Sequence, residues 1–280
     1  MTSTKLIFLL ASFKIYLGMK KIVFFFLFIQ NMLLGQVLNI DRELVSDTLP
    51  KNHIFSATFG FSSDKQKNNV SFFKSNLEYD RMFKNKHVFI SSFKSDLTSK
   101  AGDLIQNAGI IQVRYRDNDF RKFRPEIFLQ YQWNEAWGME SRLLQGINLR
   151  EKWIKKNGFD FITALGIFRE QETWSWVGVN ESLVPLNAGL IKKDLFKFNT
   201  YVKSAFQISQ NIDFSAISFV QFPLTNDFAK PRWIWDCNLY FNLSKHVHFQ
   251  VHYDHIFDAN TIVPISEYYY SVSTGLQIVM

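Results

Sequence analysis

The chain ends in the stretch YYYSVSTGLQIVM, residues 268–280. Alternate positions of this stretch carry mostly large or apolar side chains, and the positions between them carry mostly small or polar ones. One set comprises Tyr268, Tyr270, Val272, Thr274, Leu276, Ile278 and Met280, and the other comprises Ser271, Ser273, Gly275 and Gln277. Because successive side chains of a β-strand point to opposite faces, this alternation predicts a strand with one apolar and one polar face.

The same alternation recurs from residue 53 onward and predicts about twelve strands. These expected strands cover 53–62, 70–80, 87–97, 106–117, 124–135, 139–151, 158–171, 196–208, 212–223, 232–243, 246–257 and 267–280. Each spans about ten to fourteen residues, whereas strands of soluble domains usually have roughly 5–6 residues and a tilted membrane strand needs roughly 9–11. The sequence therefore predicts an all-β fold, a transmembrane antiparallel up-and-down β-barrel of about 12 strands.

The overall composition agrees with strands rather than membrane helices. Hydrophobic residues make up 47% of the chain and aromatic residues 17%, yet the mean hydropathy is −0.09. Apolar residues must therefore be interleaved with polar ones, instead of forming the runs of about 20 residues that a membrane helix needs. The lone Cys237 excludes an intrachain disulfide and gives no zinc cluster.

The N-terminus has the pattern of a secretory signal. Met19 is followed by Lys20 and Lys21 and then by the apolar run IVFFFLFI at 22–29, which match the basic and apolar regions of a signal peptide. An uncleaved anchor helix is the alternative, but the apolar run is short for a span of about 20 residues. We expect cleavage after Gly35, and Met19 is expected to be the natural start.

This assignment divides the chain into three parts and accounts for its charge. Residues 1–35 are expected to form the signal peptide, 36–52 a short N-terminal periplasmic segment, and 53–280 the barrel. Four lysines and no acid lie in 1–35, so their removal lowers the formal net charge from +7 to +3. The remaining charge does not indicate a nucleic-acid partner, and no nucleic-acid motif is present.

The connections between the expected strands alternate in length. Those after even-numbered strands are short, as at 83–86, 155–158, 209–211 and 244–245, with a looser one at 117–122. Those after odd-numbered strands are longer, at 63–69, 98–105, 172–195, 224–231 and 258–266, except for the tight 136–138. Outer-membrane barrels have short periplasmic turns and long outer loops, so we expect the loop 172–195 to face outside.

The last eight residues also resemble a targeting signal. In 273–280 a polar residue is followed by Gly275 and by alternating hydrophobic residues, which is similar to the C-terminal signal of outer-membrane barrels. Met280 stands where that signal usually ends in Phe or Trp. The resemblance implies localisation in a Gram-negative outer membrane and recognition of the C-terminal strand by the barrel-assembly machinery.

Two motifs in the middle of the chain point to a family. Residues 124–134 read RPEIFLQYQWN and residues 142–150 read RLLQGINLR. They resemble the salt-induced outer-membrane protein family, whose members share an R-P-E start, a Q-Y-Q-x-N strand and an R-x-L-x-G-x-x-x-R strand. The stretch ALGIFRE at 164–170 is similar to the following strand of that family. The resemblance implies an outer-membrane β-barrel and no particular activity.

Charged and polar side chains on the polar faces of the expected strands are candidates to line a lumen. These residues are Arg114, Arg116, Glu126, Gln130, Gln132, Arg142, Arg150, Glu170, His246, His248, His252 and Asp254. With Glu172, the arginines and glutamates could form an ion-selective constriction or a packed salt-bridge lattice that closes the lumen. Both alternatives fit a barrel of twelve strands, whose size lies between filled barrels and open porins.

The histidines on the polar face of 246–257 allow two interpretations. Imidazoles at alternate strand positions are roughly 7 Å apart, so they could be metal ligands or a general base. The same residues also suit a polar, hydrogen-bonded lumen. A zinc site needs three or four converging ligands, and nothing in the spacing provides this convergence. We therefore predict no metal, no cofactor and no catalytic residues.

Other positions suggest a lipid-modifying enzyme or membrane anchors. His255, on the apolar face, could belong to a lipase-like Ser–His pair, but no serine motif lies nearby in the sequence. Tryptophans near the strand ends are expected to anchor the barrel at the membrane surfaces, and a sugar-stacking platform in 172–195 is the alternative. These tryptophans are Trp133, Trp137, Trp174, Trp176, Trp233 and Trp235.

Three functions remain after these observations. The first is a structural or small-solute-permeable barrel with a role in envelope or osmotic adaptation. The second is an outer-membrane lipase or deacylase, and the third is a soluble secreted carrier, which the strand lengths argue against. The first is preferred, with outer-membrane lipid as the surrounding partner and a monomer as the expected state.

Overall fold

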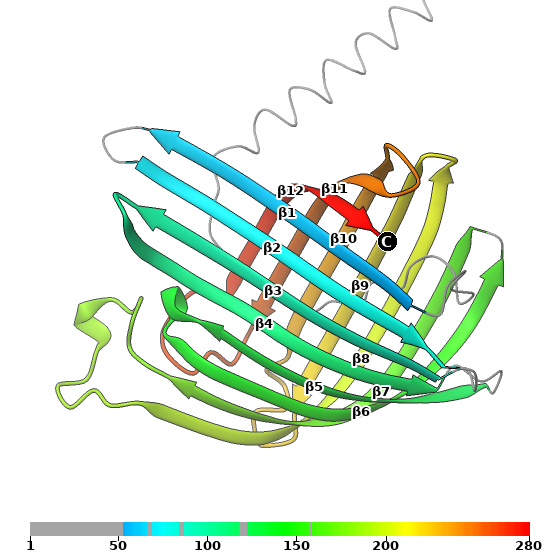
Figure 1. Cartoon of the computed structure of the whole chain (residues 1–280). Helices are drawn as coiled ribbons and strands as arrows, with labels where there is room; N and C mark the ends of the chain where they lie inside the picture. Colours follow the sequence, from blue (N-terminus) through cyan, green and yellow to red (C-terminus); the bar gives the residue numbers. More distant parts are fainter. Residues whose placement is uncertain (1–52, 66–68, 84–86, 118–121, 157) are drawn as a thin grey trace, which may run out of the picture. The chain divides into compact units, whose positions relative to one another are not determined.

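The computed structural model describes residues 53–65, 69–83, 87–117, 122–156 and 158–280. The expected signal peptide and the segment 36–52 lie outside the described residues. The described chain forms a closed barrel of twelve strands (Figure 1). The strands are β1 (His53–Lys65), β2 (Asn69–Met82), β3 (His87–Lys100), β4 (Asp103–Asp117), β5 (Phe123–Asn134), β6 (Met139–Lys156), β7 (Phe159–Trp174), β8 (Ile191–Ser209), β9 (Ile212–Pro223), β10 (Arg232–Asn242), β11 (Val247–Asp258) and β12 (Tyr268–Val279).

Each strand pairs antiparallel with the next one along the chain, and β1 pairs with β12 to close the barrel. The predicted fold and strand number are therefore confirmed. Each strand therefore has a hydrogen-bonded neighbour on both sides, which satisfies most backbone polar groups of the strands without a partner chain. Two short 3₁₀ helices, Glu135–Trp137 and Glu181–Leu183, lie in the connections. Among the described residues, no helix is long and apolar enough to cross a membrane.

The first strands are longer than their hydrophobic alternation predicts. β1 continues to Lys65, and β2 already begins at Asn69. Only residues 101–102 separate β3 from β4. The longer connections expected at 63–69 and 98–105 are therefore wrong. Backbone pairing continues there through polar residues, since a strand whose two faces both meet water needs no alternation.

Two ends of the barrel can be distinguished by their connections. The end of the barrel where β1 begins and β12 ends is called the turn end. It carries the short connections 210–211 and 243–246. The opposite end is called the loop end. It carries the longer connections 175–190, 224–231 and 259–267. Odd-numbered strands run from the turn end to the loop end.

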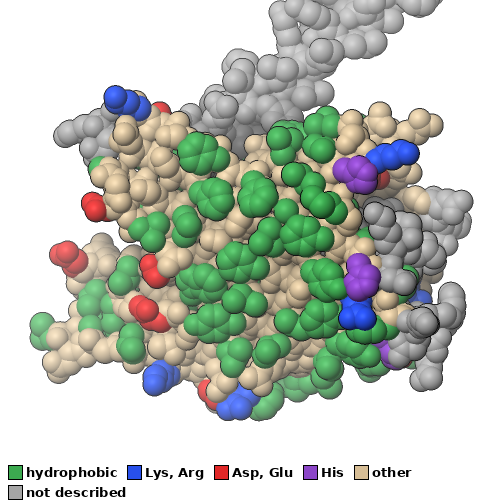
Figure 2. Space-filling view, in the orientation of Figure 1, with side chains coloured by type: hydrophobic (Ala, Val, Ile, Leu, Met, Phe, Trp, Pro, Cys, Tyr) green, Lys and Arg blue, Asp and Glu red, His purple; other side chains and the backbone are tan. Residues whose placement is uncertain are grey.

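The outer surface of the barrel is apolar around its middle. Figure 2 shows hydrophobic side chains covering the centre of the visible face, with charged side chains mostly toward its margins. Because such a band leaves large apolar side chains in contact with the surroundings, it suits hydrocarbon rather than water. Its members on the strands include Phe59, Phe61, Ile111, Ile127, Leu129, Ile147, Leu149, Leu165, Ile167, Phe196, Trp233, Trp235 and Leu276.

The interior is filled by both polar and apolar side chains. Buried charged and amide side chains alternate with the outward apolar ones along the strands. On β7 to β11, however, the inward side chains also form an apolar cluster, which differs from the expected polar lumen. Its members are Ile162, Ala164, Tyr201, Ile217, Phe219, Ile234 and Ile256.

Glycine allows close packing at one interior position. The rings of Phe128 and Phe168 lie 6.2 Å apart between their centroids. A Cβ on Gly146 would lie 2.5 Å from Phe168 Cβ and 2.6 Å from the ring of Phe128. The absence of a side chain at Gly146 therefore lets two aromatic residues from β5 and β7 meet over β6.

We predict that Gly146→Ala lowers the free energy of unfolding by about 1–3 kcal/mol, the usual cost of overpacking a close-packed core. Gly189→Ala is the control, because no atom lies within 4 Å of its Cβ position. Urea unfolding of the refolded protein, followed by the loss of heat-modifiable migration on a gel, measures the difference. Equal unfolding midpoints for the two variants would contradict this packing.

Candidate functional site in the barrel lumen

Six charged side chains form an ion-pair lattice inside the loop-end half of the barrel. We call it the central lattice, and it consists of Arg142, Glu170, Glu172, Lys197, Arg232 and Asp258. Three cations thus meet three carboxylates; five of these side chains are at most 7% exposed, and that of Asp258 is 14% exposed. Because buried charges are tolerated only when they are paired, this balance makes the lattice possible.

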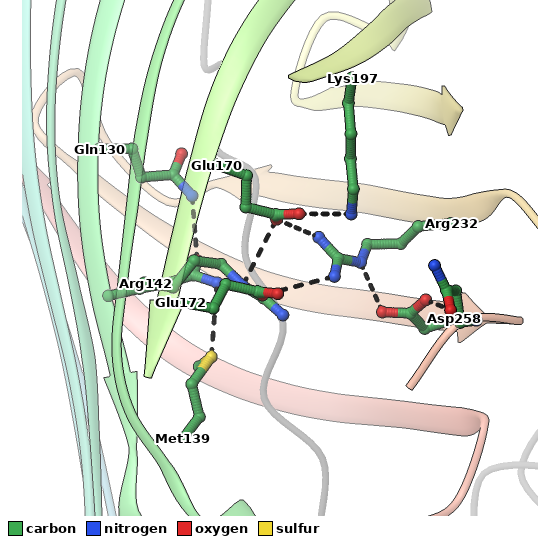
Figure 3. Close-up of polar contacts among 10 residues, drawn as sticks. Gln130, Met139, Arg142, Glu170, Glu172, Lys197, Arg232 and Asp258 are labelled. Carbon is green, nitrogen blue, oxygen red and sulfur yellow. Dashed lines mark hydrogen bonds and ion pairs between the residues drawn. The ribbon is translucent and has the colours of Figure 1, made fainter. Parts of the chain in front are cut away.

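The central lattice crosses the lumen (Figure 3). Arg232 of β10 reaches Glu170 of β7, with 2.5 Å between Arg232 Nη1 and Glu170 Oε1, and its Nε donates to Asp258 Oδ2 of β11 at 2.7 Å. Glu170 also pairs with Lys197, and Glu172 pairs with Arg142. Strands β8 and β9 lie between β7 and β10 in the wall, so these contacts run through the interior instead of along neighbouring strands.

A second ion-pair group lies on β4, β5 and β6. We call it the Glu126 cluster. Glu126 Oε2 is 2.9 Å from Arg116 Nη2 and 3.8 Å from Arg150 Nε, and Oε1 is 3.3 Å from Arg114 Nη1. Asn148 Nδ2 donates to Glu126 Oε1 at 2.9 Å. One buried carboxylate thus joins side chains from three adjacent strands.

The residues that carry the family resemblance share one face. Arg124 and Glu126 of the R-P-E start lie on the same face of β5 as Gln130, Gln132 and Asn134. In β6 the arginines of the motif, Arg142 and Arg150, are both buried. Register pairs Gln132 with Arg142 and Arg124 with Arg150. The polar residues of the two motifs therefore line the interior of the barrel.

An apolar group closes the mouth at the loop end. We call it the mouth cluster: Met139, Trp174 and Val263 are buried together, and partly buried neighbours pack on them. Val263 lies in the β11–β12 connection, whereas Met139 and Trp174 belong to β6 and β7. Trp137 also approaches Tyr269 of β12, with 4.1 Å between ring centroids. The neighbours are Trp137, Trp176, Val179, Ile191, Ile262 and Ile265.

Five of the six predicted tryptophan anchors separate into two groups, and the sixth, Trp133, is partly buried and donates from Nε1 to Asn107 Oδ1 at 3.0 Å. Trp233 and Trp235 are about two fifths exposed on the outer face, and Trp233 Nε1 donates to Ser218 Oγ at 2.7 Å. Trp174 is buried and Trp137 and Trp176 pack against it, so the prediction of surface anchors is wrong for these three. Their position near strand ends is the same, but their side chains turn toward the mouth.

The histidines of the expected polar face are placed differently from one another. His248, His252 and Asp254 belong to β11, and Asp254 is buried. His252 Nε2 is 3.1 Å from Asp236 and its Nδ1 is 3.7 Å from Asp254. His246 is exposed in the turn before β11, with its Nδ1 3.1 Å from the carbonyl oxygen of Val279.

Within the described chain, the contacts of His252 and His255 do not include a serine hydroxyl of the kind that a Ser–His pair requires. Both ring nitrogens of His252 face carboxylates, so neither is directed at its register partner Ser273. His255 contacts the rings of Trp235 and Tyr268 on the outer face, at 6.3 Å from each. Among the described residues, no group of three or more His, Cys, Asp or Glu side chains could hold a metal ion.

A cavity lies beside the β1–β12 junction. It measures about 80 Å³ and is lined by β1, β2, β3, β11 and β12, with Lys74, Lys94, His252 and Asp254 among its walls. We call it the seam pocket. Small residues at the junction, Gly60, Ser273 and Gly275, leave this space open. The sequence pattern showed these small residues but not that they would lie beside the two lysines.

No protein-family model matches the chain, and no curated sequence is similar to it at a significant level. Among solved structures, the NanC porin has a TM-score of 0.44 at 10% identity, covering 81% of this chain and 97% of that one. The translocator domain of the autotransporter NalP from Neisseria meningitidis has a TM-score of 0.42 at 8% identity, covering 81% and 87%. The Pseudomonas putida toluene transporter TodX has a TM-score of 0.37 at 6% identity, covering 81% and 86%.

The geometry itself defines the class of protein. A closed antiparallel barrel, an apolar outer band and a charged interior together constitute the architecture of a transmembrane β-barrel. Within that class, the interior of this barrel is crossed by ion pairs and apolar contacts at more than one level. The candidate site is therefore a lumen lined by ion pairs and apolar contacts between its own side chains.

We predict that Glu170→Gln lowers the free energy of unfolding by about 3–5 kcal/mol, because removing one partner leaves buried cations uncompensated. Asp194→Asn is the matched control: its exposed pair with Arg169, 2.6 Å apart, lies on the outer face one residue from Glu170. An exposed ion pair contributes little, since water screens it. Unfolding curves of both variants in urea measure the contrast, and equal losses would argue against a buried lattice.

Proposed function

We propose that this protein is an outer-membrane barrel with a closed lumen, which serves the envelope structurally and passes at most water and small ions. The observation that carries the proposal is the central lattice, in which Arg232 joins Glu170, Glu172 and Asp258 across the interior. A hydrated solute would have to separate these buried charges in order to pass, and separated buried charges are strongly unfavourable.

The mouth cluster supports the same conclusion from the loop end. Val263 is only 1% exposed, so this residue of the β11–β12 connection packs into the mouth cluster, whereas Pro264, Ser266 and Glu267 are exposed. A solute entering from this side first meets apolar side chains, which do not replace its water of hydration. Two barriers of different chemistry therefore lie in series along the barrel axis.

The location and the biological role belong to the proposal as well. The apolar outer band and the C-terminal stretch 273–280 support insertion in an outer membrane. The resemblance of 124–134 and 142–150 to the salt-induced outer-membrane protein family supports a role in adapting the envelope to osmotic stress. In that role a rigid, closed barrel would strengthen the membrane without increasing its permeability.

We predict that the refolded protein in a planar lipid bilayer has a conductance far below that of an open porin. Replacing both barriers, with Glu170→Ala and Arg232→Ala in the lattice and Trp174→Ala and Val263→Ser at the mouth, should raise the conductance clearly. Replacing one carboxylate and one cation together leaves the net charge of the central lattice unchanged, while Lys197 and Asp258 each lose their ion-pair partner. Single-channel recording in symmetric salt measures the conductance of the unmodified protein and of the variant.

The control removes an ion pair of the same chemistry from the outer face. Arg169→Ala with Asp194→Ala eliminates an exposed Arg–Asp pair next to Glu170 in the sequence, and the conductance should stay at the level of the unmodified protein. Porin-like conductance of the unmodified protein would overturn the proposal of a closed lumen. Heat-modifiable migration confirms that each variant is folded before it is recorded.

A further inference from the structure

Three of the residues that line the seam pocket carry a buried oxygen without a hydrogen-bond partner among the described residues. These oxygens are Thr58 Oγ1 of β1, Asn76 Oδ1 of β2 and Asp254 Oδ2 of β11. Asp254 is only 5% exposed, so its carboxylate is shielded from bulk water. Because a buried polar group is costly to leave unpaired, the seam pocket suits a ligand that donates hydrogen bonds.

The other charged groups around the seam pocket already have partners. Asp254 Oδ1 lies 3.7 Å from His252 Nδ1, and His252 Nε2 lies 3.1 Å from Asp236 Oδ2. On the facing wall, Lys74 Nζ lies 3.2 Å from Asp96 Oδ2. These contacts hold the walls in place and leave Asp254 Oδ2 as the charged acceptor for a ligand.

Lys94 of β3 supplies a cation to the same pocket. It interacts electrostatically with Asp236 and Asp254, yet within the described part of the chain its ammonium group forms no direct ion pair. Register places Lys94 beside Asn76, whereas Asp254 comes from β11 on the opposite side. A ligand with a positive and a negative group therefore finds a complementary charge on each wall.

The barrel wall behind the seam pocket is tightly packed. Register pairs run through Ser56–Phe59. Beyond them, a Cβ on Gly60 would lie 3.1 Å from the carbonyl oxygen of Thr274, and a Cβ on Gly275 would lie 3.0 Å from Thr58 Cγ2. Because β1 and β12 are this close at the level of the pocket, a ligand reaches the pocket through the lumen and not through the wall.

The seam pocket lies nearer the turn end than the central lattice does. β11 runs from the turn end to the loop end, and its residues Gln250, His252 and Asp254 line the pocket. Asp258, which belongs to the central lattice, comes one turn of the alternation later on the same strand. A solute that enters at the turn end therefore meets the seam pocket before it meets the lattice.

The size of the seam pocket limits the ligand to a very small molecule. Its volume of about 80 Å³ has room for roughly five to eight water molecules, at roughly 10–15 Å³ for each. The smallest molecules that carry both an ammonium and a carboxylate group, such as glycine and alanine, are of this size. Larger amino acids exceed the space between the two walls.

We propose that the seam pocket binds a small zwitterionic amino acid, of the size of glycine or alanine, that enters the lumen from the turn end. The ammonium group has three N–H donors, which match in number the oxygens of Asp254, Asn76 and Thr58. The carboxylate lies against Lys94. Because the ligand carries one charge of each sign, it compensates Asp254 and Lys94 together.

This inference goes beyond the proposed function and is independent of it. It requires the barrel fold, but neither a closed lumen nor a particular membrane. Binding is measured on the refolded barrel in micelles of an uncharged detergent, whereas conductance is measured across a bilayer. Failure of one proposal therefore leaves the other unaffected.

The first experiment tests the chemistry of the ligand. Equilibrium dialysis of the refolded full barrel compares isotope-labelled glycine with acetate, methylammonium and N,N,N-trimethylglycine. Acetate and methylammonium each lack one of the two charged groups, and trimethylglycine keeps both charges but has no N–H to donate. We expect glycine to bind about tenfold more tightly than each of the other three, as expected for the loss of a charge-assisted hydrogen bond.

Each equality among these probes would overturn the proposal in a different way. Equal binding of methylammonium would show a cation site, and equal binding of acetate would show an anion site. Equal binding of trimethylglycine would show that the three oxygens do not accept hydrogen bonds from the ligand. No binding of any probe would show that the pocket takes only water.

The second experiment tests the position of the ligand. Lys94→Gln and Asp254→Asn should each weaken glycine binding about tenfold, and Ser273→Leu, which puts a larger side chain into the pocket without changing its charge, should weaken it at least as much. Lys192→Gln and Asp194→Asn remove the same charges at exposed positions of β8 and should bind like the unmodified protein.

Heat-modifiable migration shows which of these variants are folded, and only folded variants are compared. If a charge variant does not fold, Ser273→Leu decides the position, because it leaves every charged group in place. Glycine binding that is unchanged in the folded variants of the pocket would place the ligand elsewhere and overturn the proposal.

Discussion

Glu170 lies inside the barrel where side chains from β6, β8 and β10 converge on its carboxylate. Arg142, Lys197 and Arg232 each pair with it, and their charge is balanced by Glu172 and Asp258. These groups are buried, so each one depends on the others for its compensation. This half of the interior consequently holds a connected set of ion pairs, and a closed lumen, as proposed above, would follow from the need to keep these charges paired.

That constraint also accounts for the distribution of space in the lumen. Where long charged and aromatic side chains face inward, on β4 to β10, only a smaller cavity of about 30 Å³ remains. Where Gly60, Ser273 and Gly275 face inward, beside the β1–β12 junction, a pocket remains. The register pairs of the same junction run from Ser56 to Phe59, and Phe55 and Met280 also exchange backbone hydrogen bonds. The ion-pair lattice and the seam pocket thus lie in different parts of the lumen.

The fold could be predicted from the sequence because alternation over stretches as long as 212–223 is typical of strands that cross a membrane. The partners inside the barrel could not. Glu170 and Arg232 are 62 residues apart, and only the register of four strands brings them together. The apolar interior cluster was missed because β7 carries apolar residues on both faces, such as Leu165 outside and Ile162 inside. Trp174 was assigned to the membrane surface because its sequence position does not reveal the side to which it turns.

The most direct test of a lattice across the lumen is a double-mutant cycle between Glu170 and Arg232. The free energies of unfolding of Glu170→Gln, Arg232→Gln and the double variant, each compared with the unmodified barrel, give the coupling between the two side chains. If they meet across the interior, the double variant should be more stable than the sum of the single losses predicts, with a coupling of about 1–3 kcal/mol. A coupling near zero would mean that the two groups do not interact, which would contradict a lattice across the lumen.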